Sequence, residues 1–460
     1  MQNNTQKKGS TLMKSNSPNH DQQSFLYQGL KEILNPKEPL YQLSEKIPWE
    51  DLEKAFTKYY IDFGRPAKPI RLMVSLMLLK QMYNLGDETV IAHWVQNPYW
   101  QYFSGEKTFQ WKFPVEPSDM VHFRKRIGEE GINKILEISI SIHGKAAMER
   151  EVVIDTTVQE KNITFPTDIK LHKRIIEQCR KITEAEGIEQ RQSYKRTVKK
   201  LIMAQRFRNH PLNKKKALQA ERKLKTIAGR MVREIERKLT LGQKEKYVSS
   251  IDIYNKILRQ KRSDTEKIYS IHEPNVYCIS KGKEHKRYEF GSKASLVITK
   301  NSGIIVGAYS LEKNEYDGHT LPKALDQCEQ LRGSRPTVAI ADRGYKGSSR
   351  IGETEIHIPK PPKKAISEYE KKKARLRFRR RAAIEPVIGH LKTDNRLSRN
   401  FLKGVIGDQI NVMLAAAAFN LRKWMRKAET FFSSFYKSIE QRIFRFLESV
   451  LSTPNLIMTF

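Results

Sequence analysis

The sequence predicts a mixed α/β protein in which helices precede, interrupt and follow a set of strands. Two observations carry this prediction. Apolar, β-branched runs bounded by turn residues occur at residues 151–155, 293–310 and 337–342, which is typical of strands. Long charged stretches with leucine and isoleucine at helical spacing surround and separate these runs.

The chain has 460 residues and carries a large positive charge, with 85 lysines and arginines against 51 acidic residues. Its net charge of +34 predicts a polyanionic partner bound in a salt-dependent way, and nucleic acid fits better than a membrane surface. We expect no membrane-spanning helix, because no long uninterrupted apolar run occurs, and no secretion, because the amino terminus is polar. Three isolated cysteines, Cys179, Cys278 and Cys328, fit a reducing compartment.

The first third of the chain is predicted to be helical after a disordered tail at residues 1–25, which is rich in Asn, Gln, Ser and Lys. We place a helical N-terminal domain at residues 40–148, with one helix at Ser44–Tyr60 and another at Pro69–Tyr83. The aromatic residues between 99 and 113 form either a surface on which bases stack or a small packed core, and the packed core is favoured.

A second helical segment is predicted as an insert at about residues 168–260, broken at Asn209-His210-Pro211. We interpret it as a helical hairpin with apolar residues turned inward, among them Leu201, Leu218, Leu224, Ile227, Met231 and Ile235. Its many charged residues fit a solvated pair of helices or a basic arm that touches DNA or a partner protomer, and the sequence favours neither.

The remaining elements follow in a fixed order. Residues 288–310 predict a strand hairpin around Asn301-Ser302-Gly303, followed by a helix at Leu321–Leu331. A strand then leads to Asp342, a short strand lies near Ile356, and a basic helix carries Glu385. This order indicates a ribonuclease H-like (retroviral integrase-like) domain at residues 150–427, with a helical C-terminal tail at residues 428–460.

Three carboxylates stand out in this layout. Asp155 follows the run Glu151–Ile154 and Asp342 follows a second buried run, so we expect both at strand ends on adjacent strands. Glu385 is expected on a helix packed over them. Oxygen-rich sites of this kind suit Mg²⁺ or Mn²⁺, and a pair of such ions can drive phosphodiester chemistry.

The residues around Glu385 have helical spacing. Phe378, Arg381, Glu385 and Lys392 share one helix face if the helix is continuous. Pro386 disfavours helical geometry at Glu385, so we expect a kink or a new helix start there. A basic face around an acid suits a carboxylate held beside phosphates.

These motifs resemble the DDE transposases of bacterial insertion sequences. Phe378, Arg381, Glu385 and Lys392 match the family's Y-R-E-K signature, with Phe in place of the usual Tyr, which puts a hydroxyl role there in doubt. Asp155-Thr156-Thr157 and Asp342–Gly347 are similar to its first two motifs, and residues 65–88 resemble the N-terminal domain of insertion sequence family five. The resemblance covers roughly residues 42–426.

The resemblance implies a transposase that binds its element's terminal inverted repeats, cleaves the ends and joins the 3′ hydroxyl to target DNA. It implies that Asp155, Asp342 and Glu385 hold two Mg²⁺ ions, with Mn²⁺ as a substitute. Arg381, Lys392, Tyr345, Lys346 and Phe378 would contact DNA. It further implies a DNA-binding N-terminal domain, a homodimer in a synaptic complex, and a cytoplasmic, nucleoid-associated location.

Three other interpretations remain open or weaker. A catalytically inert DNA-binding protein would be favoured by a missing acid, and all three acids are present. A ribonuclease H-like nuclease without strand transfer fits the same residues. A basic ribosome-associated protein would explain the charge but none of the three acids.

Asp317 follows the hairpin where the family often has an acid, and we interpret it as turn-forming.

Overall fold

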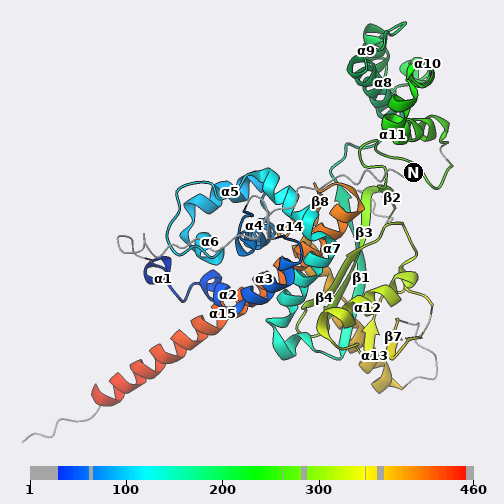
Figure 1. Ribbon diagram of the computed structural model, residues 1–460. Helices are drawn as coiled ribbons and strands as arrows, with labels where there is room; N and C mark the ends of the chain where they lie inside the picture. Colours follow the sequence, from blue (N-terminus) through cyan, green and yellow to red (C-terminus); the bar gives the residue numbers. More distant parts are fainter. Residues whose placement is uncertain are drawn as a thin grey trace, which may run out of the picture.

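The computed structural model describes residues 29–61, 66–261, 263–280, 287–347, 349–359 and 367–451, with the side chains of 373, 374, 377 and 430–451 left aside. The predicted disordered tail at residues 1–25 lies outside these ranges. Figure 1 shows a body of helices packed beside a mixed sheet, from which a group of helices stands apart. The mixed α/β class and the helical N-terminal region are confirmed.

The N-terminal region is built from short helices around one long one. They are α1 (Leu30–Ile33), α2 (Pro39–Lys46), α3 (Trp49–Thr57), α4 (Ile70–Met82), α5 (Asp87–Gln96), α6 (Pro98–Phe103), α7 (Pro117–Ser141) and the 3₁₀ turn η2 (Gly144–Ala147). The prediction of one helix at Ser44–Tyr60 is wrong, because Pro48 separates α2 from α3.

The aromatic residues between 99 and 113 divide between the two interpretations. Trp100 and Phe103 are buried in the core, whereas Trp111 and Phe113 are exposed. Tyr99, Tyr102 and Phe109 are partly buried and pack against a small cluster of Leu30, Leu34 and Tyr41. The packed core is therefore correct for the α6 aromatics and Phe109, but not for Trp111 and Phe113.

The sheet has eight strands, and β1 lies at its centre. The strands are β1 (Glu151–Lys161), β2 (Tyr277–Ile279), β3 (Glu289–Thr299), β4 (Ile305–Ser310), β5 (Val338–Ile340), β6 (Arg350–Ile351), β7 (Thr354–His357) and β8 (Arg399–Asn400). The order runs β2-β3-β1-β5-β7-β6, with β4 beside β3 and β8 beside β1. The pairs β1–β3 and β3–β4 are antiparallel, while β5 and β8 run parallel to β1. The predicted hairpin at residues 288–310 is confirmed.

Helices cover the sheet on the side of the body. The 3₁₀ turn η3 (Asp317–Thr320) and α12 (Leu321–Arg332) follow the hairpin, and α12 packs on β3, β4 and α7. The basic segment is two helices, α13 (Glu368–Arg381) and α14 (Ile384–Thr393), and α14 contacts β1 and α15. The break at Ala382-Ala383 confirms the new helix start that Pro386 predicts.

The last helix, α15 (Gly404–Leu451), begins in the core and continues through the predicted domain limit at residue 427. Its segment Gly404–Glu429 is long and apolar enough to cross a membrane, yet 83% of its most apolar window is buried inside the fold. It packs on β4, α4 and α7, which explains the apolar composition. In this protein the segment is a core helix.

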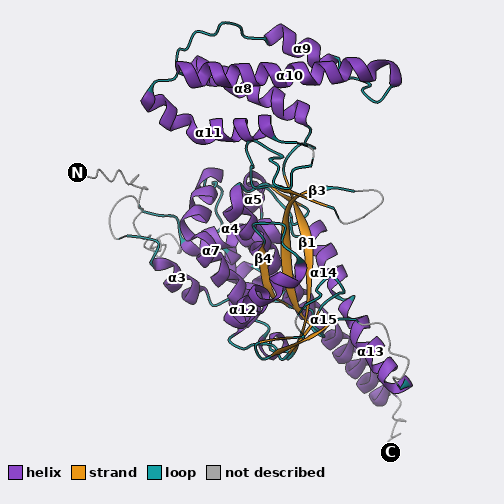
Figure 2. Cartoon of the chain, turned by 90° about the vertical axis from the view of Figure 1, so that its right-hand side faces the viewer, coloured by secondary structure: helices purple, strands orange, loops and turns teal. Residues whose placement is uncertain are grey.

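The insert stands apart from the sheet and has its own core (Figures 1 and 2). It consists of α8 (Asp168–Ala185), α9 (Lys195–Met203), α10 (Pro211–Lys238) and α11 (Leu241–Arg259). The predicted hairpin is therefore a four-helix unit, because turns at residues 186–194 and 239–240 add further breaks. Leu224, Ile227, Met231 and Ile235 are buried as predicted, but Leu218 is 43% exposed.

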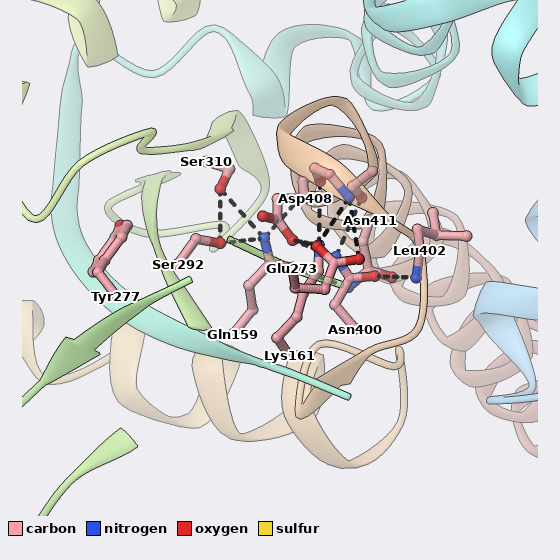
Figure 3. Close-up of polar contacts among 12 residues, drawn as sticks. Gln159, Lys161, Glu273, Tyr277, Ser292, Ser310, Asn400, Leu402, Asp408 and Asn411 are labelled. Carbon is pink, nitrogen blue, oxygen red and sulfur yellow. Dashed lines mark hydrogen bonds and ion pairs between the residues drawn. The ribbon is translucent and has the colours of Figure 1, made fainter. Parts of the chain in front are cut away.

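A buried polar network fastens the far end of β1 to α15 (Figure 3). Lys161 Nζ donates to Asp408 Oδ1 at 2.6 Å and lies 3.4 Å from Glu273 Oε2. Gln159 donates to the Asp408 carbonyl and to Ser292. The network joins β1, α15 and the segment that returns from the insert.

Candidate active site

The three predicted acids come from three separate elements. Asp155 lies in the middle of β1, so the prediction that it ends a strand is wrong, since β1 continues to Lys161. Asp342 follows β5 as predicted. The parallel register pairs Val153 with Ile340, the residues that lie two positions before Asp155 and two positions before Asp342. Both carboxylates lie close enough to Tyr345 to raise the pKa of its hydroxyl.

Arg381 links Asp155 to Glu385. Its guanidinium lies 3.8 Å from Asp155 Oδ2 and 3.5 Å from Glu385 Oε1. The arginine is the last residue of α13 and the glutamate lies in the first turn of α14, so the break between the helices faces β1. The Glu385 side chain is 64% exposed and therefore open to a ligand.

The loop after β5 is held in a tight turn. Asp342 Oδ1 accepts a hydrogen bond from the Gly344 amide at 2.7 Å. A Cβ at Gly344 would lie 2.9 Å from the same oxygen and 3.7 Å from Asp317 Oδ2. A side chain at position 344 would therefore crowd the Asp342 carboxylate, and the Asp317 carboxylate lies close to the same position.

Asp317 is the residue whose role the sequence did not reveal. It begins η3, as a turn-forming residue would, but its side chain also reaches the site. Asp317 Oδ1 accepts from Thr156 Oγ1 at 3.1 Å and from Lys293 Nζ at 3.0 Å. Lys293 is nearly buried on β3. It lies 24 residues before Asp317 in the sequence, and no local pattern indicates that the two side chains meet.

Gly318 explains how η3 comes so close to the loop after β5. A Cβ there would lie 2.8 Å from the Lys346 carbonyl oxygen and 2.7 Å from the Tyr316 ring. Only glycine fits this approach. The contact brings the Asp317 carboxylate to the loop that follows β5, where it also accepts from Thr156 of β1.

Tyr345 lies beneath the acids and not on the surface. It is 1% exposed, so its ring is covered in this structure, and its direct contact with DNA stays a prediction. Burial raises the pKa of its hydroxyl well above the usual range, and the neighbouring carboxylates of Asp155 and Asp317 raise it further. A neutral tyrosine therefore supports the site from below at every physiological pH.

The other predicted DNA contacts lie on different parts of this surface. Lys346 is exposed in the loop after β5. Phe378 is partly buried and packs against the core, so its ring helps to anchor α13. Lys392 lies half-buried two turns after Glu385 on α14.

The donor atoms fit a divalent cation by type. All are carboxylate oxygens, which Mg²⁺ and Mn²⁺ prefer. Across the described parts of the chain, no three His, Cys, Asp or Glu side chains are grouped closely enough to hold a metal ion. Instead, the Arg381 guanidinium lies between two of the acids, which shows that the site attracts positive charge.

Two family models match the chain. Residues 28–126 match a transposase domain (DUF772), and residues 260–421 match a transposase DDE domain. The second range contains Asp342 and Glu385, while Asp155 and the insert lie between the two. Transposases of this family act on DNA and generally use divalent metal ions.

A relative from Rhizobium meliloti, an uncharacterised protein named ORF8 in the nfe locus, is 37% identical over 201 residues. The match covers 42% of this chain and 97% of the relative. No solved structure gives a significant match.

Proposed function

The chain belongs to the DDE transposases, and we propose that it moves its own insertion sequence. It would bind the terminal inverted repeats, cut the ends by metal-dependent hydrolysis, and join the resulting 3′ hydroxyl to target DNA. The observation that supports this most directly is the meeting of Asp155 and Glu385, far apart in the sequence, at one arginine beside Asp342.

The sheet supports a ribonuclease H-like catalytic domain. Its central order β4-β3-β1-β5-β7 has three antiparallel strands followed by two that run parallel to β1. The acids come from the central strand, its parallel neighbour and a helix that contacts β1. We assign residues 150–427 to this domain and residues 40–148 to a DNA-binding domain. We also propose that the chain is a member of insertion sequence family five.

Asp155, Asp342 and Glu385 would hold two Mg²⁺ ions, and Mn²⁺ would substitute. Such ions activate an attacking oxygen and stabilise the leaving oxygen at phosphorus. Arg381 would turn from the carboxylates to the scissile phosphate, since a guanidinium matches phosphate oxygens in two-pronged contacts. Lys392 and Lys346 would hold neighbouring phosphates, while Tyr345 and Phe378 would keep the loop and α13 in place.

Processing of both ends together requires two active sites, so we propose a homodimer in the synaptic complex. The protein would work in the cytoplasm, associated with the nucleoid. The net charge of +34 supports tight, salt-dependent association with DNA.

The test is cleavage of a labelled duplex that carries the inverted repeat flanking the gene. Parent and Glu385→Gln are compared with Mg²⁺ and with Ca²⁺. We expect nicking by the parent in Mg²⁺ only, and DNA binding without nicking by the variant. Equal binding without cleavage in both proteins would instead favour the inert DNA-binding protein.

A strand-transfer assay separates the transposase from a nuclease that does not join DNA. Pre-nicked end DNA is incubated with supercoiled plasmid. Joined products are expected for the parent and not for Glu385→Gln. Hydrolysis without joined product would favour the nuclease.

A further inference from the structure

A cavity of about 810 Å³ lies where the insert joins the sheet. Both connections line it: residues 162–166 lead from β1 to α8, and residues 269–272 lead back toward β2. The first turns of α8 and Arg399 of β8 complete the lining. Figure 2 shows the insert beyond the end of the sheet, with these connections between them. We call this cavity the neck groove.

The neck groove is basic. Lys170, Lys173, Arg174 and Arg399 line it, against one carboxylate, Glu177. That carboxylate is shared by Lys173 at 3.4 Å and Arg174 at 3.3 Å. The groove therefore keeps an excess of positive charge, and Arg174 and Arg399 are exposed to a ligand.

Aromatic packing fixes the walls of the neck groove. Phe290 of β3 meets Phe165 edge-on at 5.4 Å and lies 5.2 Å from Tyr269. These contacts join the outgoing connection, the returning connection and the sheet. Lys170 Nζ also donates to the Phe165 carbonyl at 2.8 Å, so the cations are mounted on a rigid frame.

The neck groove and the acids lie along the same edge of β1. β3 pairs with one edge of β1, so the parallel strands β5 and β8 lie at the other. Asp342 follows β5, and Arg399 in β8 pairs with Glu160. Asp155 and Glu160 are five residues apart, which is about 16 Å along a strand. This distance corresponds to about five base pairs of B-DNA.

We propose that the neck groove binds the sugar-phosphate backbone of the DNA duplex whose end lies at the acids. This inference rests on the proposed function and names a contact of the insert with DNA. The cations would contact phosphates about five base pairs from the cleaved bond. A groove of fixed walls and multiple cations suits a regular, highly charged backbone better than a protein surface.

The test neutralises three cations, Lys173→Gln, Arg174→Gln and Arg399→Gln, in one full-length protein. The matched control carries Lys214→Gln, Lys215→Gln and Lys216→Gln, which lie on α10 of the same insert and do not line the groove. Affinity for the fluorescent end duplex is measured over a range of salt concentrations in Ca²⁺. Phosphate ethylation interference then maps the phosphates that the protein touches.

We expect the groove variant to bind at least tenfold more weakly than the control at moderate salt. Its log–log salt slope should be shallower by about 0.9 for each phosphate that the variant no longer neutralises. Interference about five base pairs from the cleaved bond should disappear in the groove variant alone. Melting temperatures of both variants should match that of the parent.

Three results would overturn the proposal. Equal affinity and equal interference in the two variants would show that the neck groove is not a DNA site. If the parent still cleaves end DNA in that case, the proposed function stands. A change in oligomeric state by sedimentation, with DNA affinity unchanged, would assign the groove to a partner chain. A parent that binds no end DNA would overturn both proposals.

Discussion

β1 carries charge at two places that differ in the length of their ion pairs and in their exposure to solvent. At Asp155 the ion pairs are long, at 3.5 and 3.8 Å through Arg381, and Glu385 is largely exposed. At Lys161 the side chain is 3% exposed, and its bond to Asp408 is 2.6 Å. The first place holds opposite charges loosely beside solvent, while the second satisfies them inside the core.

The difference indicates how one strand serves two purposes. We expect the long ion pairs of Arg381 to exchange this cation for another one more easily than a short, buried pair does. The Lys161 network cannot exchange partners in this way, because an uncompensated charge in the core is costly. We therefore assign the acids to chemistry and the network to holding β1, α15 and the returning segment together.

The largest expected effect is on cleavage by Asp342→Asn. Asparagine can still accept from the Gly344 amide, so the loop is kept, but the anionic metal ligand is removed. Cleavage in Mg²⁺ should fall at least about 10³-fold, since metal assistance is worth several kcal/mol. Affinity for end DNA should stay equal or rise, because a negative charge near phosphate is removed.

Asp326→Asn is the control for that change, since Asp326 on α12 is an exposed acid that pairs with Arg335. It should cleave as the parent does. Cleavage by Asp342→Asn within a few fold of the control would mean that the acids at β1 are structural, like those of the network.

The next largest effect is on stability, through Lys161→Met. Removing the cation leaves Asp408 and Glu273 buried without their partner, which should cost about 3–5 kcal/mol in the free energy of unfolding. Lys238→Met removes an exposed lysine paired with Glu234 and should cost about 1 kcal/mol or less. Urea unfolding followed by circular dichroism measures both.

The pH dependence of that loss has a defined sign. Burial raises the pKa of Asp408 above its ordinary value even with Lys161 present. A raised folded-state pKa contributes stability at low pH that is lost as the pH rises. Lys161 lowers the pKa of Asp408, so Lys161→Met should raise it further. The Lys161→Met penalty should therefore be larger at pH 7 than near the ordinary Asp pKa of about 4. A penalty that grows on acidification would contradict the assignment.

An intermediate effect is expected for Asp317→Asn. The asparagine keeps an acceptor for Thr156 and Lys293 but no longer places a negative charge beside Asp342. Outer partners of metal ligands typically change metal affinity or activity by about 10–100-fold. The Mn²⁺ concentration for half-maximal cleavage should rise. The melting temperature should fall as well, because the nearly buried Lys293 loses its carboxylate partner. An unchanged Mn²⁺ requirement would return Asp317 to a turn-forming role.

Local patterns predicted the elements of the sheet and the order of the acids. The β-branched runs identified β1, β3, β4 and β5, and Pro386 located the start of α14. For Asp155 the missing information was the pairing of its strand. The polar residues Thr156 and Thr157 suggest that the strand ends there, but β1 continues to Lys161 because it pairs with β3 along this length. The insert was interpreted as a hairpin because the sequence shows one clear break, at Asn209-His210-Pro211. The break at residues 186–194 has no comparable sequence pattern.

Long-range contacts explain what the sequence did not show at the site. Lys293 and Asp317 meet only because the hairpin folds η3 back onto the loop after β5. Tyr345 lies in a glycine-punctuated segment that resembles an exposed turn, and its neighbours Arg343, Gly344, Lys346 and Gly347 are indeed exposed. The Tyr345 side chain alone is buried. Side-chain burial in such loops depends on a partner element that no local pattern contains.

The smallest expected effect, Tyr345→Phe, sharpens the contrast most directly. Phenylalanine keeps the ring packing and removes only a hydroxyl that burial and the nearby carboxylates keep protonated. If Tyr345 supports the acids from below, affinity for end DNA should stay within about twofold of the parent, well under the 1.4 kcal/mol of a tenfold change. Lys346→Gln changes the exposed neighbour and should weaken binding. The log–log slope of affinity against salt should become shallower by the amount expected for about one lost phosphate contact. Fluorescence titration of both variants distinguishes the roles, and a larger loss for Tyr345→Phe than for Lys346→Gln would mean that the loop opens and presents the tyrosine to DNA.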